Sequence, residues 1–347
     1  MPLSSSVRLS FQLLFQISTA VLLAYAIWFF GNKWLSGLLV LSTVSCFYPG
    51  LTRNSFATFQ LIVFAAAWYL ILVYALKREW VHILLDAMCI IALCHVLYQI
   101  VQMCGYDFIF KDIGGTVNSG KIVGLMSNTN ETSALLAFCL PAFFRKRWFW
   151  FMPMMLLGFI NTRVTGGVLA AIVMVIVFTF SFKQKWVWIT GVGSCIIGGL
   201  LFYLFVDTPD IINRFNTWKV VWNLYSQKWI MGFGLGHFQN VFVNPVLKAI
   251  LGANFAQAHN DILQGVFEMG IGFVVLVGGY FVSIIRRVNK KAILSLAAIT
   301  GIVVNSLVNF PFHIAITAMV AVTWMAILQV QLNDIKRPDK LDYRRSC

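Results

Sequence analysis

Residues 207–261 are the longest polar interruption in a strongly apolar chain, and they gather the side chains best suited to chemistry. Arg214 and Lys219 come early in this segment, a Gly-Phe-Gly-Leu-Gly-His run follows, and His259 closes it in an Ala-His-Asn-Asp run. Cations, a histidine and glycines beside apolar spans indicate that something charged binds there, because such groups are costly against a bilayer. If the chain does chemistry, we expect it in this segment.

His259 stands where the next apolar span begins, so it is predicted at a helix N-terminus on the water boundary. A neutral imidazole, with an ordinary pKa of ~6.5, can accept a proton at neutral pH. Asn260 or Asp261 can cap the helix or orient the ring. The plainer alternative is a histidine that bonds a loop carbonyl. The sequence leaves His237 undecided and gives the other histidines no comparable surroundings.

Thr208-Pro209-Asp210 is a good helix start, with a cap, a proline in the first turn and an acid at the positive end of the dipole. The residues that follow predict one apolar stripe at helical spacing: Ile211, Phe215, Trp218, Trp222 and Tyr225. Arg214 and Lys219 fall on opposite margins of that stripe. The pattern predicts a helix lying along the membrane surface with its cations at headgroup depth. The alternative is a plain amphipathic helix whose two cations only extend toward water and bind no ligand.

Gly234 and Gly236 belong to a turn whose glycines permit positive φ and a close approach of backbone to a ligand. The run lacks the strand and helix of a dinucleotide fingerprint, so no nucleotide site is expected. Asn130 lies with other polar residues inside an apolar span, where such groups find protein partners or line a cavity. Glu268 and Asp86 are also acids within spans, and either can simply neutralise a neighbouring cation.

Composition defines the class of protein that positions these residues. Hydrophobic residues make up 60% of the chain and charged residues only 11%, against roughly 25% in soluble domains. Apolar runs near the ~20 residues that cross a bilayer predict an all-α, polytopic bundle of about 10 to 11 spans, forming one integral membrane domain over 1–347. The runs are 10–30, 34–51, 56–76, 81–103, 123–143, 147–161, 165–182, 186–206, 262–285, 291–309 and 314–331.

Cation placement predicts the topology. The formal charge of +14 does not mark a nucleic-acid partner, because most of the 26 Lys and Arg fall on one side of the bilayer if the C-terminus is cytoplasmic. The loop 207–261 then lies outside the cytoplasm, and eleven full spans also place the N-terminus outside. Trp148 and Trp150 beside Arg145–Arg147 are predicted interfacial anchors.

Four segments in this order resemble the O-antigen ligase and O-antigen polymerase superfamily of bacterial membrane glycosyltransferases: Gly124–Pro141, Asn161–Gly167, Arg214–Phe238 and Ala258–Gly272. The specific ones are an Arg followed by Trp, then Gly-x-Gly-x-Gly-x-Phe, then Ala-His-Asn-Asp-x-Leu-Gln with Glu268 and Gly270 behind. The family's Thr-x-Ser-Arg pattern differs here, because Arg163 comes two positions early in Thr-Arg-Val-Thr. The resemblance covers residues 120–285 well and the first hundred only as hydrophobic spans.

The resemblance implies an enzyme of the bacterial inner membrane that works on the periplasmic face. Its donor is a glycan on undecaprenyl pyrophosphate, and its acceptor is a sugar hydroxyl on a glycan or on the lipid A core. It needs no metal or other cofactor, and the scattered acids of the loop fit that expectation. His259 is then the catalytic base. The expected substrate-binding residues are Arg214, Arg163, Lys219, Asn130, Gly234, Gly236, Asn260 and Glu268.

Two other functions stay open at this point. A repeat-unit polymerase of the same superfamily shares the framework and differs in its acceptor. A transporter or flippase for an anionic lipid or solute would use Arg214 and Glu268 in a translocation path. A transporter predicts inverted repeats and paired broken helices, whereas the polar groups here concentrate in the second half of the chain.

Overall fold

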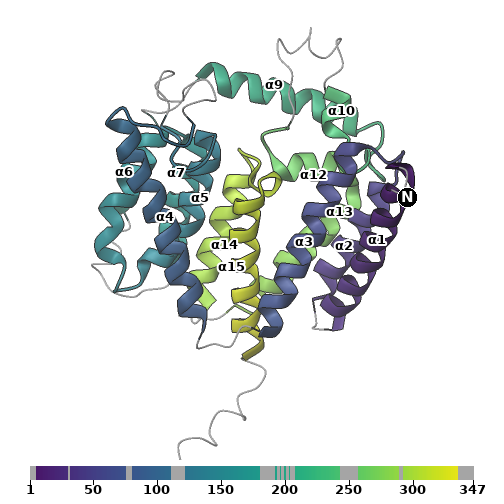
Figure 1. The fold of residues 1–347 in the computed structure, drawn as a ribbon, viewed down its shortest axis with the longest axis horizontal. Coiled ribbons are helices and arrows are strands. Elements are labelled where there is room, and N and C mark those ends of the chain that lie inside the picture. Colours follow the sequence, from purple (N-terminus) through teal and green to yellow (C-terminus); the bar gives the residue numbers. More distant parts are fainter. Residues whose placement is uncertain are drawn as a thin grey trace, which may run out of the picture. The chain divides into compact units, whose positions relative to one another are not determined.

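The computed structural model describes residues 5–29, 32–75, 80–110, 122–179, 208–242, 257–288 and 292–334, with a few single positions between 192 and 203. Every regular element among them is helical, which confirms the predicted all-α class for these residues (Figure 1). The first half holds α1 (Ser5–Phe29), α2 (Lys33–Cys46), α3 (Arg53–Ala75), α4 (Val81–Met103), α5 (Thr129–Cys139), η2 (Leu140–Phe144), η3 (Phe149–Phe151), α6 (Met152–Thr162) and α7 (Thr165–Thr179). The second half holds α9 (Thr208–Tyr225), α10 (Phe238–Phe242), α12 (Asp261–Met269), α13 (Ile271–Ile285), α14 (Ile293–Ser306), η5 (Pro311–His313) and α15 (Ala315–Asp334).

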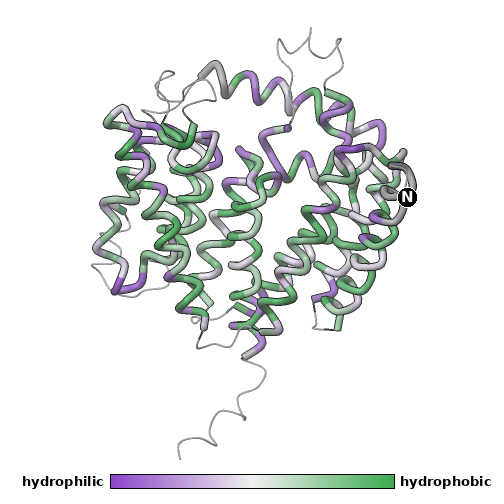
Figure 2. Tube along the Cα trace, in the orientation of Figure 1, coloured by the Kyte–Doolittle hydropathy of each residue, from purple (hydrophilic) through white to green (hydrophobic). Residues whose placement is uncertain are grey.

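The helices have the composition of a membrane protein. Four of those described are long and apolar enough to cross a bilayer: Gln12–Phe29, Arg53–Ala75, Val81–Met103 and Ala315–Asn333. Five shorter apolar helices accompany them: Lys33–Cys46, Phe149–Thr162, Thr165–Thr179, Ile271–Ile285 and Ile293–Ser306. Figure 2 shows the hydrophobic colour along these helices. The count of ten or eleven spans stays a prediction, and most of the predicted span 186–206 lies outside the described residues.

The predicted span 123–143 begins later than its hydropathy indicates. α5 starts at Thr129, because the Asn128 side chain accepts the N–H of Asn130 (2.8 Å) and caps the helix. The preceding residues form a turn in which Gly124 has a φ of 67°. Gln102 Oε1 accepts the N–H of Gly124 at 2.8 Å and fixes that turn to α4. Hydrogen bonds from polar side chains therefore replace helix over the first six residues of the predicted span.

The predicted span 262–285 is two helices rather than one. α12 ends at Met269 and α13 starts at Ile271, with Gly270 between them at a φ of 67° and a ψ of −160°. A side chain at Gly270 would overlap the carbonyl of Ile230, so only glycine lets these backbones meet. The prediction of one continuous helix was wrong because a tertiary contact breaks it.

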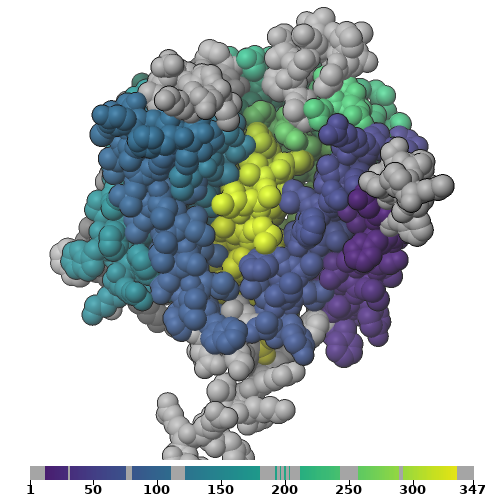
Figure 3. Space-filling view, in the orientation of Figure 1, coloured from purple at the N-terminus to yellow at the C-terminus, as the bar shows by residue number. Residues whose placement is uncertain are grey.

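The contacts divide the chain into two compact units. The first comprises Met1–Ile71 and Thr208–Arg287. In it α2 packs against α1 and α13, and α12 packs against α2, α9, α10 and α13. Figure 1 shows α9 running crosswise to the helices α1, α2 and α13, and Figure 3 shows α1, in purple, at the surface of the unit. The prediction of a single membrane domain over 1–347 stays a prediction.

The second unit comprises Leu72–Asp207 and Val288–Cys347. α7 and α14 pack closely, since Gly301 of α14 admits the side chain of Met174. α5 packs against α4, α6, α7, α14 and α15, and the fully buried Trp324 donates its indole N–H to the carbonyl of Phe138 at 2.8 Å. Small residues on facing helices permit this close approach, as is typical of helices packed in membranes.

Candidate functional site

α9 carries Arg214 on the side that packs against the protein. The helix begins at Thr208, as the Thr-Pro-Asp start predicts. Its buried residues are Thr217, Val221 and Tyr225, spaced four apart, and Arg214 and Trp218 are half-buried on the same face. Burial raises the pKa of the Tyr225 phenol, which donates to the carbonyl of Trp229 at 3.1 Å.

The residues of the predicted apolar stripe are not all buried on one face of α9. Phe215 and Trp222 are 61% and 58% exposed, so two of the five stripe residues point away from the protein. Lys219 is exposed as well. The helix therefore has a protein-facing stripe that includes Arg214 and an outward aromatic stripe accompanied by Lys219. The predicted position of the two cations on opposite margins needs this correction, because Arg214 lies within the packed face.

A hydrogen bond joins α9 to the segment that holds His259. The indole N–H of Trp218 donates to the carbonyl of Ala258 at 2.7 Å, and Ala258 is buried. Arg214 precedes Trp218 by four residues, one helical turn or ~6 Å along the axis. The first unit thus brings the half-buried face of α9, with Arg214, to the start of α12, with His259.

His259 has an unusual backbone conformation. Its φ is 51°, and among the described residues it shares a positive φ with only one other non-glycine residue. Asn260 follows and caps α12, its side chain accepting the N–H of Leu263 at 2.8 Å. Of the two predicted caps, the structure therefore selects Asn260. Asp261 is buried in the first turn, and the half-buried His259 lies two residues before it.

The glycine run forms a loop packed against other backbone. Gly232, Gly234 and Gly236 all have positive φ values, of 71°, 99° and 70°. A side chain at Gly234 would overlap the carbonyl of Tyr48, and a Cβ at Gly236 would lie 2.7 Å from the carbonyl oxygen of Asn54. The Gly234 N–H donates to the carbonyl of Glu268 at 2.9 Å. These close approaches are to protein backbone, and substrate binding by Gly234 and Gly236 stays a prediction.

Glu268 fastens this loop to α12. The side chain is 2% exposed, and its carboxylate accepts the N–H groups of Gly236 (2.9 Å) and Phe238 (3.3 Å). Gln264, one turn earlier, donates its amide to the same carboxylate at 3.1 Å and accepts the N–H of Ala258 at 3.0 Å. One network therefore runs from the glycine loop through α12 to the residue beside His259. These hydrogen bonds are those of a structural group, and a role of Glu268 in substrate binding is still a prediction.

Gln264 is not among the residues predicted for this site, and the sequence leaves His237 undecided. Gln264 and Glu268 are four residues apart, so they share one face of α12. This spacing indicates that the two side chains can interact. His237 is buried, with its Nδ1 3.3 Å from the Ser55 hydroxyl and 3.2 Å from the carbonyl of Leu235. Its contacts hold the glycine loop to the start of α3.

Asn130 and Arg163 belong to the second unit and are described within it. Asn130 lies in the first turn of α5, and its carbonyl accepts the side-chain amide of Asn309 at 3.3 Å. Arg163 is the exposed C-cap of α6, with a left-handed φ of 53° and ψ of 37°. Ser133 of α5 contacts Gly167 of α7, so the first turns of these helices meet. Asn130 and Arg163 therefore lie near that junction.

No metal-binding cluster of three or more His, Cys, Asp or Glu side chains occurs within the part of the chain that the structure describes. Comparison of the chain with protein-family models and with curated proteins gives no match. The functional assignment therefore rests on the residues and their geometry.

Proposed function

We propose that the protein is a membrane glycosyltransferase of the O-antigen ligase and polymerase superfamily, acting as a ligase. It transfers a glycan from undecaprenyl pyrophosphate to a sugar hydroxyl of a lipid A core or another glycan, without a metal ion. The reaction takes place on the periplasmic face of the bacterial inner membrane, where the segment 207–261 lies.

The pairing of α9 with the start of α12 is the observation that carries the proposal. The bond from Trp218 to the carbonyl of Ala258 joins the half-buried face of α9, which carries Arg214, to the residue that precedes His259. A guanidinium and an imidazole on two elements joined in this way suit a reaction that expels a pyrophosphate and removes a hydroxyl proton. The strained backbone of His259 is typical of residues kept for function.

Arg214 and His259 can assist the two ends of the glycan transfer. The acceptor hydroxyl oxygen attacks the anomeric carbon of the donor glycan, and the bond from that carbon to the pyrophosphate oxygen breaks. The departing undecaprenyl pyrophosphate takes the electron pair, and Arg214 stabilises the oxygens on which its charge develops. His259 takes the proton of the attacking hydroxyl. Lys219, exposed on the same helix as Arg214, supplies further positive charge for the donor.

Deletion of the gene tests the proposal when the surface polysaccharide is run on a gel. A ligase predicts loss of all capped lipid with build-up of lipid-linked polymer. Caps of a single repeat unit would assign the polymerase reaction instead. An unchanged ladder would contradict transfer of this class of glycan. It would favour the alternative function, a transporter of an anionic lipid or solute.

A further inference from the structure

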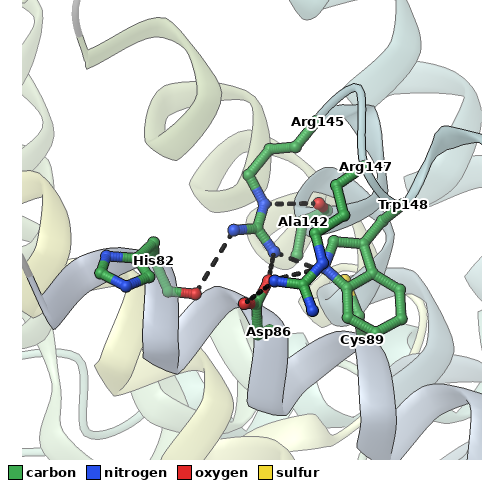
Figure 4. A network of polar contacts seen from close by, with 7 residues as sticks. All are labelled: His82, Asp86, Cys89, Ala142, Arg145, Arg147 and Trp148. Atoms are coloured by element: carbon green, nitrogen blue, oxygen red, sulfur yellow. Dashed lines mark hydrogen bonds and ion pairs between the residues drawn. The ribbon is translucent and has the colours of Figure 1, made fainter.

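Asp86 of α4 is the centre of a polar network at one end of that helix (Figure 4). Its Oδ1 accepts hydrogen bonds from Arg145 Nη2 and from the indole N–H of Trp148, both at 2.6 Å. Its Oδ2 accepts one from Arg147 Nη1 at 3.2 Å. The expectation that Asp86 neutralises a neighbouring cation is confirmed, and the carboxylate has two such partners.

The two arginines are held differently. Arg145 also donates to the carbonyls of Ala142 (3.0 Å) and His82 (3.3 Å), so it is built into the protein. The Arg147 guanidinium lies 5.5 Å from the centre of the Trp148 ring, and its side chain stays 76% exposed. Arg147 is thus oriented by a carboxylate on one side and an aromatic face on the other, with its outer surface open.

The charges of this network do not cancel. Arg145, Lys146 and Arg147 bring three positive charges, and in the described part of the chain only Asp86 pairs with them. Two positive charges remain, and both of the outer cations, Lys146 and Arg147, are exposed. An exposed pair of cations beside a fixed carboxylate is complementary to an anion with several oxygens, such as a phosphate.

Apolar surface adjoins these cations. Trp150 is 84% exposed, and Phe149 and Phe151 beside it are also exposed. On α4, the exposed Ile83, Ile90 and Leu97 recur every seven residues and form an outward stripe, on the same side of the helix as Asp86. Aromatic rings and cations at the end of an apolar helix are the chemistry of the lipid headgroup region.

We propose that Lys146 and Arg147 bind the phosphate of an anionic membrane lipid whose acyl chains lie along the stripe of Ile90 and Leu97. Trp150 lies at the depth of the ester groups. A soluble phosphate would leave the aromatic and aliphatic surfaces uncovered, which favours the lipid as the ligand. This site is independent of the proposed glycosyltransferase reaction, since none of its residues belongs to that site.

Lipid retention by the purified full-length protein tests this site. Native mass spectrometry in detergent compares phosphatidylglycerol with phosphatidylcholine of identical chains, for the wild type, Arg147→Gln and Lys146→Gln. We expect the wild type to retain phosphatidylglycerol preferentially, and each substitution to weaken it about fivefold, because a cation near an anionic surface contributes ~1 kcal/mol. Arg286→Gln removes an exposed cation after α13 that has no such aromatic neighbours, and it should leave retention unchanged.

Three results would overturn the site. Equal retention of the two lipids would remove the preference for an anion. An equal loss in Arg286→Gln would show a general charge effect rather than a site. Inorganic phosphate that displaces phosphatidylglycerol at millimolar concentration would show that the acyl chains contribute nothing. Within the described residues Lys146 makes no hydrogen bond or ion pair, so its substitution keeps the test valid if Arg147→Gln folds poorly.

Discussion

Two residues assigned to the reaction, His259 and Arg163, adopt left-handed backbone conformations. In an L-amino acid this conformation costs roughly 1–2 kcal/mol, because the Cβ atom crowds the carbonyl oxygen. They are the two non-glycine residues with positive φ in the described ranges; Arg163 directly follows α6, and His259 precedes the N-cap of α12. Glycine would remove the cost at either position, so the larger side chains there agree with the proposed roles of both residues.

Two substitutions of His259 distinguish the loss of the catalytic base from the relief of backbone strain. We expect His259→Ala and His259→Gly to lower transfer at least ~100-fold, because the base is gone in both. We also expect His259→Gly to be about 1 kcal/mol more stable than His259→Ala, since glycine tolerates the φ of 51°. An in vitro transfer assay and thermal unfolding in detergent give the two values.

His82→Ala is the matched control for these variants. His82 is exposed on α4, and only its backbone carbonyl contacts Arg145. Its substitution should leave transfer near the wild-type rate. Substantial residual transfer in both His259 variants would remove the imidazole from the mechanism, and equal stability of the two would show that residue 259 is not strained.

Replacement of Arg214 by lysine tests the shape of the cation rather than its charge. A guanidinium presents two parallel N–H donors to phosphate oxygens, whereas an ammonium acts as a point charge. We expect Arg214→Lys to lower kcat at least about tenfold, with the protein still folded in membranes. Arg286→Lys, the same change at an exposed arginine, should have no effect. Equal activity of Arg214→Lys and wild type would contradict bidentate binding.

At the scale of elements, the glycine loop and the end of α12 act as one support for the candidate base. The N–H of Phe233 donates to the carbonyl of Phe267 at 2.8 Å, and the rings of these residues stack at 4.4 Å. Glu268 holds the far end of the loop. Because α12 begins two residues after His259, we expect a disturbance of the loop to reach the candidate site through α12.

Gly234→Ala should disrupt this support. The added methyl group overlaps the carbonyl of Tyr48, and a φ of 99° disfavours any side chain. We expect a loss of about 2 kcal/mol or more in stability, together with loss of activity. Gly278→Ala is the control, because its Cβ meets nothing within 4 Å and alanine favours the helix α13. Thermal unfolding of both variants should move in opposite directions, and a stable, active Gly234→Ala protein would contradict this role of the loop.

Local chemistry allowed part of this site to be predicted from the sequence. The start of α9 at Thr208 and the cap at Asn260 follow from residue types at helix ends. The burial of α9 could not be predicted, because lipid and protein interior are both apolar and periodicity does not tell which stripe faces which. The break at Gly270 was also missed, since it depends on a contact with Ile230, forty residues earlier in the chain.

At the scale of the whole molecule, activity should not depend on a divalent ion. Fixed cations such as Arg214 take the place of a metal in the proposed mechanism, so they stabilise the departing pyrophosphate by themselves. We expect EDTA to leave transfer by the purified protein unchanged within about twofold. Strong inhibition that Mg²⁺ or Mn²⁺ reverses would show that the donor is bound through a metal.

The proposed reaction requires that residues 207–261 lie outside the cytoplasm, and the distribution of Lys and Arg in the sequence predicts that Arg145–Arg147 lie inside it. Exposed Ser226 follows α9, and exposed Lys146 belongs to the Asp86 network. In a background without native cysteines, we expect a membrane-impermeant maleimide to label Ser226→Cys on intact spheroplasts and Lys146→Cys only after permeabilisation. The distribution of Lys and Arg along the chain predicts this result, because cations are retained on the cytoplasmic side. Labelling of Lys146→Cys but not Ser226→Cys on intact spheroplasts would place the imidazole and guanidinium in the cytoplasm, away from any periplasmic acceptor.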